Sequence, residues 1–89
     1  MGDGYEISHQ DAFDKGLRAV FGSAKAGDAA CEGVMWMLAA KPSLGKQMTL
    51  AVWSLEITHP THGTVLILYT FNPVTKIVTL LRAVPRATP

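Results

Sequence analysis

Two arginines close an apolar stretch near the end of the chain. Residues 66–86 read LILYTFNPVTKIVTLLRAVPR, in which Arg82 and Arg86 follow the second of two apolar runs. A guanidinium group stays charged and forks onto phosphate oxygens, so two of them at the exit of a rigid hairpin suit a phosphate-binding site. Charges at the end of a strand also discourage edge-to-edge association. Arg82 and Arg86 are therefore either candidate phosphate ligands or strand-end charges.

Two histidines lie in the segment ITHPTHG, which is expected to form a turn between strands. An exposed histidine can act as a general acid or base near neutral pH, which makes His62 a candidate for proton transfer. Ordinary turn polarity is the simpler interpretation of His59 and His62. No cysteine or acidic residue accompanies them at a spacing suited to zinc, so neither a metal site nor a cofactor is expected.

Two lysines flank a Pro-x-x-Gly turn in the segment KPSLGK. Lys41 and Lys46 could contact phosphates there, although solvated surface lysines are more common. The net charge of the chain is only +1, which argues against a protein that coats nucleic acid without selectivity. The charge is uneven, because residues 1–32 carry a net −3 and residues 33–89 a net +4. This asymmetry allows a local anion-binding surface that the total conceals.

The 89 residues predict one small domain, residues 1–89, with a modest core. Apolar residues make up 48% of the chain, so we expect some of them to remain exposed for a partner. Cys31 is the single cysteine, which leaves no internal disulfide and fits a reducing cytosol. The first residues do not resemble a signal peptide, and the longest apolar run, 65–69, is too short to cross a bilayer. We expect a cytoplasmic protein that does not enter membranes.

The first half of the chain has the periodicity of two helices. After a short strand at residues 5–8, Ser8 is the expected N-cap of a helix that ends at Gly22. Its buried face is predicted to hold Phe13, Leu17, Val20 and Phe21, spaced as one helical face. A second helix is expected to begin near Asp28 and to end before Pro42, with Ala30, Val34, Met37 and Leu38 facing inward. Core packing is also the expectation for Trp36, Trp53 and Tyr69.

The second half alternates as strands do. Residues 52–58 alternate apolar and polar side chains, residues 64–71 are apolar on both faces, and residues 76–84 form a last strand after the NPVT turn. The expected fold class is α+β in the order β-α-α-β-β-β. A short N-terminal strand and a helical hairpin pack on a small antiparallel sheet.

This order of elements, with several local segments, resembles the RelE/ParE superfamily of bacterial type II toxins, including its RelE-like and phage-type HigB-like members. The similar segments are 38–45, with its Pro-x-x-Gly turn, and 52–55, 68–73 and 77–81. The resemblance implies a RelE/ParE-like fold and a toxin that inhibits growth until a cognate antitoxin protein binds it. RelE-like members cut messenger RNA at the ribosome, whereas ParE-like members inhibit DNA gyrase.

Cleavage by a RelE-like member would use the RNA's own 2′-hydroxyl to attack the adjacent phosphate. The protein must then move protons and stabilise a crowded dianionic phosphorane. Arg86 matches the basic residue that follows the last strand in the family, so the resemblance implies a catalytic role for it. Arg82 and His62 are expected to assist, and Lys41 and Lys46 to bind RNA. The activity would be that of a metal-independent endoribonuclease, an mRNA interferase.

Two other functions stay open. RelE-type nucleases commonly carry an arginine three residues before the tyrosine of the central strand, and this chain has Leu66 there. Many of them also carry a tyrosine or histidine beyond the last strand, which this chain lacks. A non-catalytic, ParE-like inhibitor of DNA gyrase is one alternative, and a catalytically inert protein-interaction domain is the other.

Overall fold

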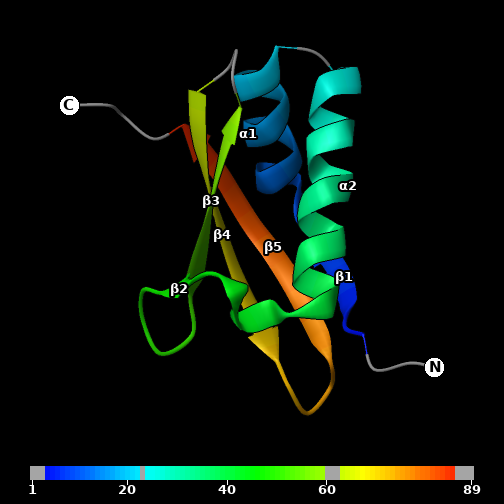
Figure 1. Cartoon of the computed structure of the whole chain (residues 1–89), viewed down its shortest axis with the longest axis vertical. Helices are drawn as coiled ribbons and strands as arrows, with labels where there is room; N and C mark the ends of the chain where they lie inside the picture. Colours follow the sequence, from blue (N-terminus) through cyan, green and yellow to red (C-terminus); the bar gives the residue numbers. More distant parts are fainter. Residues whose placement is uncertain (1–3, 23, 60–62, 86–89) are drawn as a thin grey trace.

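The computed structural model describes residues 4–22, 24–59 and 63–85, and it places two helices against one face of a sheet (Figure 1). In the described parts of the chain, no helix is long and apolar enough to span a membrane. The elements in chain order are β1 (Glu6–His9), α1 (Asp11–Phe21), α2 (Ala24–Ala40), the 3-10 turn η1 (Pro42–Leu44), β2 (Lys46–Gln47), β3 (Trp53–His59), β4 (Gly63–Asn72) and β5 (Ile77–Pro85).

The sheet has five strands in the order β1-β5-β4-β3-β2. The pairs β2–β3, β3–β4 and β4–β5 are antiparallel, as expected from their short connections, but β1 pairs with β5 in parallel. The prediction of a purely antiparallel sheet was therefore wrong at one edge. Parallel pairing needs a long connection between the two strands, and here residues 10–76 lie between them.

The central strand β4 has the predicted character. Its alternate residues Val65, Ile67 and Tyr69 are fully buried against the helices, and Leu66 and Leu68 are half-buried on the other face. The helices contribute Phe13, Leu17, Phe21, Val34 and Leu38 to the same core, and β5 adds Val78, Leu80 and Ala83. This arrangement leaves the face of the sheet opposite the helices, called the open face below, without a covering layer in the described chain.

Helix α1 buries the predicted face and ends at the predicted glycine, since Gly22 has a left-handed φ of 74°. Its start was predicted wrongly. Ser8 lies within β1, paired with Thr79, and Gln10 occupies the N-cap without a side-chain hydrogen bond. Ser8 is therefore part of the strand rather than a helix cap. The pairing of β1 with β5 continues one step beyond β1, because the Gln10 N–H donates to the Leu80 carbonyl at 3.0 Å.

Helix α2 ends before Pro42 as predicted but begins at Ala24, four residues before the expected start at Asp28. The expected start lay directly after Gly27, with Asp28 as a possible cap. In the structure Gly27 is buried against α1, and a Cβ there would lie 3.3 Å from the Arg18 Cγ. The glycine thus allows close helix–helix approach.

Three aromatic residues, Trp36, Trp53 and Tyr69, were predicted to pack in the core, and the structure bears this out for two of them. Tyr69 is fully buried and Trp53 packs half-buried against the core, as expected. Trp36 is 78% exposed, so the prediction for it was wrong. It lies on the outer side of α2, whereas Val34 and Leu38 point into the core.

Two helical glycines offer a matched stability test. A Cβ on Gly16 would overlap the Ala83 carbonyl of β5, whereas a Cβ on Gly33 would meet no atom within 4 Å. We expect Gly16→Ala to lower the free energy of unfolding by about 1–3 kcal/mol through overpacking. Gly33→Ala should raise it by up to about 1 kcal/mol through helix propensity. Urea denaturation of both variants checks this, and equal shifts would contradict the close contact between α1 and β5.

Candidate functional site

The open face carries one cross-strand row that ends in a cation on each side. Its members are Lys46 on β2, Ser54 on β3, Leu68 on β4 and Arg82 on β5. Residues paired directly across strands point to the same face, and Leu68 points away from the helices because its neighbours Ile67 and Tyr69 are buried beneath them. Lys46 and Arg82 are both exposed, so the row presents two cations to solvent.

A β-bulge directs Arg82 to this face. The pairing of β4 with β5 shifts between Leu68 and Tyr69, which leaves Leu81 as an extra residue. Leu80 before the bulge is fully buried on the helix side, and in a regular strand Arg82 would point the same way. The extra residue reverses the alternation, so Arg82 faces outward while Ala83 returns to the core.

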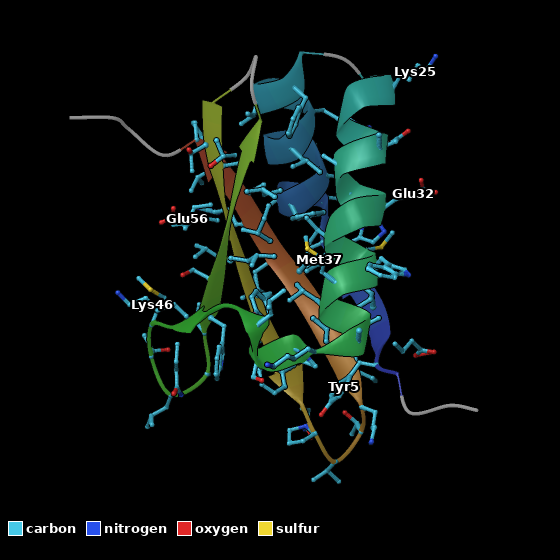
Figure 2. The ribbon with its side chains drawn as sticks, viewed as in Figure 1. Tyr5, Lys25, Glu32, Met37, Lys46 and Glu56 are labelled. Carbon is cyan, nitrogen blue, oxygen red and sulfur yellow. The ribbon has the colours of Figure 1, made fainter. Side chains whose placement is uncertain are left out.

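The region between the two cations combines apolar and acidic groups. Leu66 and Leu68 are half-buried at its centre, and Ser54 is buried. Glu56 lies one row further along, paired with Leu66, and Figure 2 shows it on the same side of the sheet as Lys46, away from the helices. A carboxylate beside two cations supplies both a proton acceptor and anion ligands on one surface.

The predicted site residues separate in the structure. Lys46 and Arg82 share the row, as a common site would require. Lys41 is exposed at the N-cap of η1, where the chain leaves α2, and no strand pairing places it in the row. Arg86 and His62 lie outside the described residues. Their predicted roles remain predictions.

A buried hydroxyl that the sequence prediction missed bonds the turn just before Lys46. Tyr69 Oη donates a hydrogen bond to the Pro42 carbonyl at 2.5 Å and accepts one from the Gly45 N–H at 3.1 Å. Burial raises the pKa of the Tyr69 hydroxyl, while the bond from the Gly45 N–H acts in the opposite direction. The hydroxyl therefore stays protonated and holds the turn that precedes β2.

The sequence held partial signals for the other missed groups. Glu56 is the single acidic residue after residue 32, and its place in an alternating strand predicts a polar face. Ser54 occupies the same face, but its alignment with Lys46 and Leu68 depends on the register of the strand pairing, which the sequence alone does not reveal.

The single cysteine has the wrong environment for a nucleophile. Burial raises the pKa of the Cys31 thiol, and the carboxylates of Asp14, Asp28 and Glu32 raise it further. The thiolate is the reactive form, so this side chain stays inert near neutral pH. Among the described residues, no group of three or more His, Cys, Asp or Glu side chains is arranged to hold a metal ion.

A second surface of interest lies on α2. Its charged residues Lys25, Asp28 and Glu32 all fall in its first half, and residues 33–40 contain none. The exposed Trp36 lies in this uncharged half. Trp36 lines a hollow on the β1 side of α2, together with Ile7 and Met35. A second hollow, of about 380 Å³, runs between α2 and β3, with Phe21, Val34, Met37 and Ile57 among its walls.

The fold matches solved toxin structures closely. The chain is similar to the toxin–antitoxin complex RelBE2 from Mycobacterium tuberculosis, with a TM-score of 0.73 and 18% identity over 96% of this chain and 94% of that one. It is also similar to a double arginine-to-alanine variant of the E. coli toxin RelE in the free state, with a TM-score of 0.64. That match has 7% identity and covers 92% of this chain and 83% of the other.

No protein-family model matches the sequence, and no curated protein does. The structural matches nevertheless span almost the whole chain and contain the same combination of helices and sheet. The chain therefore has the fold of the RelE toxins, which confirms the fold class expected from the sequence.

Proposed function

We propose that this protein is the toxin of a bacterial toxin–antitoxin pair and that its open face binds and cleaves messenger RNA at the ribosome. The observation that carries the toxin role is the RelE fold, which extends over 96% of the chain. The row from Lys46 to Arg82 supports RNA as the target, because a phosphate backbone is bound chiefly by lysine and arginine.

The proposed cleavage needs three tasks, and the open face offers a group for each. Arg82, together with the sequence candidate Arg86, stabilises the charge that develops on the phosphate. Lys46 holds a neighbouring phosphate at the other end of the row. Glu56, or the sequence candidate His62, takes the proton from the 2′-hydroxyl as its oxygen attacks phosphorus, and water protonates the 5′-oxygen that leaves.

Induced expression without a partner tests this proposal. We expect growth arrest, with new RNA ends in primer extension that cluster within translated codons, because cleavage would occur on the ribosome. Normal growth would contradict the toxin role and favour an inert interaction domain.

A protein target is the second candidate, and the centre of the open face favours it. Leu66 stands between Glu56 and Val84 in the row beside the cations, so the middle of this surface is apolar. An apolar centre with a charged rim is typical of protein interfaces. Growth arrest without RNA cleavage, accompanied by inhibition of gyrase supercoiling in vitro, would identify the ParE-like function instead.

The proposed antitoxin contact is the uncharged half of α2 with the adjoining hollow beside β3. One solved neighbour is a toxin–antitoxin complex, which supports a protein partner for this chain. An amphipathic helix of the antitoxin would fit the hollow, because its apolar side would contact Met37 and Ile57 while its polar side remained in solvent. Trp36 would form an exposed anchor on the other side of Gly33, which lines both hollows of α2. A stable complex of this kind buries about 1,600 Å² in total.

A further inference from the structure

The connection from α2 to β2 is fastened at two points by one side chain. The Tyr69 ring is fully buried in the core, and its hydroxyl reaches out of the core to the turn. The hydroxyl bonds the Pro42 carbonyl at the start of η1 and the Gly45 N–H just after its end. A single oxygen thereby fixes both ends of the segment that precedes Lys46.

The same turn packs in close contact with β3. A Cβ on Gly45 would overlap the Ser54 carbonyl and the Tyr69 hydroxyl, so only glycine allows this approach. Ser54 also directs its hydroxyl to the Lys46 carbonyl, at a long 3.5 Å. The backbone of Lys46 is thus located by a contact network that begins at Tyr69.

Strand β2 is held from both ends, by the turn before it and by the turn after it, where the N–H groups of Met48 and Thr49 donate to the Val52 carbonyl at 2.8 and 3.1 Å. The strand contains only Lys46 and Gln47, each with one partner on β3, and it forms the edge of the sheet. Two cross-strand residue pairs hold a segment only weakly by themselves, because short strands are marginally stable. Lys46 directly follows the turn that Tyr69 bonds, whereas Gln47 adjoins the turn after the strand, so the turn before β2 bears most directly on the lysine.

From these contacts we infer that Tyr69 is a positioning residue for Lys46, holding its ammonium group in the phosphate-binding row. The inference rests on the proposed RNA-binding function of the open face. It goes further by assigning a role in ligand binding to a hydroxyl that lies under the opposite side of the sheet.

The test is Tyr69→Phe, which keeps the ring in the core and removes only the hydroxyl. The probe is a ten-nucleotide 2′-O-methyl RNA, which cannot be cleaved because its attacking hydroxyl is blocked. Affinity is measured across a salt series for the wild-type protein, Tyr69→Phe, Lys46→Ala and the double variant. Val78→Ala serves as the control, because it weakens the core at a buried position of β5 that pairs with Phe71 and not with a residue of the row.

Losing one phosphate contact to a single strand should reduce the slope of log affinity against log salt by about 0.7, so Lys46→Ala is expected to show that change. Tyr69→Phe should reduce the slope in the same direction and lower affinity about 3–10-fold at low salt, as for a partly lost ion contact. The double variant should bind no more weakly than Lys46→Ala, because the hydroxyl acts through that lysine. Val78→Ala, measured well below its melting temperature, should bind like the wild type.

Amide hydrogen exchange provides a readout that needs no RNA. Tyr69→Phe should accelerate exchange at Gly45 and Lys46 at least tenfold, while Val78→Ala should not act selectively there. Ser54→Ala offers a milder variant, expected to change exchange and affinity in the same direction, should Tyr69→Phe fail to fold.

The outcomes separate the two levels of inference. RNA binding that is weakened in Lys46→Ala but unchanged in Tyr69→Phe would overturn the positioning role alone. Unchanged exchange at Gly45 and Lys46 would also overturn it. A wild-type protein that does not bind the RNA even at low salt would overturn the function proposed for the open face, whatever the exchange rates show.

Discussion

Arg86→Ala is expected to lower the rate of RNA cleavage about 10²–10³-fold, equivalent to about 3–4 kcal/mol of transition-state stabilisation. The residue directly follows Pro85, the last residue of β5, which is still paired with Val65. Charged side chains are seldom fully buried, so we expect this guanidinium to lie in solvent. The variant should therefore melt within about 1–2 °C of the wild type, since surface changes usually alter stability little.

The measurement combines growth after induction, primer extension and thermal melting. Lys25→Ala is the matched control, because it removes one positive charge from the helix layer, away from the open face (Figure 2). Arg82→Ala should act in the same direction as Arg86→Ala, since the bulge at Leu81 brings Arg82 to the open face. A large drop in melting temperature for Arg86→Ala would show that the arginine is structural.

Trp36→Ala is expected to weaken binding of the antitoxin at least about 30-fold, the cost of losing an interface hot spot of about 2 kcal/mol. A tryptophan that is 78% exposed is an unusual surface residue, and here it lines a hollow on the uncharged half of α2 with Ile7, Met35 and Ala39. The free protein should fold normally, because the side chain contributes little to its core. Toxicity should then persist even when the antitoxin is expressed together with the variant.

Leu50→Ala is the control for this prediction. Leu50 is 99% exposed between β2 and β3, so its removal deletes apolar surface outside the proposed contact. Isothermal titration of the purified antitoxin onto both variants gives the comparison. Equal affinities for Trp36→Ala and the wild type would place the antitoxin on another surface.

The features that the sequence determined are those governed by neighbours along the chain. The spacing of Phe13, Leu17 and Phe21 defined the inner face of α1, and Pro42 stopped α2 because it cannot continue a helix. Alternation between Trp53 and Ile57 defined β3. These signals depend on local periodicity and backbone chemistry, so they survive without knowledge of the fold.

Part of the candidate site was also visible in the sequence. Lys46 and Arg82 were identified by charge and by their places beside a turn and near a strand end. Their juxtaposition was not, because it requires the register of three strand pairs and a bulge at Leu81. Without that bulge, simple alternation would have directed Arg82 into the core with Leu80.

The remaining features were decided by contacts between distant parts of the chain. The parallel pairing of β1 with β5 took Ser8 into a strand although its local sequence suited a helix cap. Tyr69 bonds the backbone of Gly45 and Pro42, which lie 24 and 27 positions earlier in the chain. The periodic pattern of its strand predicted that the ring is buried, but it could not predict these two hydrogen bonds. Trp36 has the hydrophobicity of a core residue, yet the rotation of α2 on the sheet leaves it outside. Such outcomes follow from tertiary packing, which overrides local preference wherever two elements compete for the same residue.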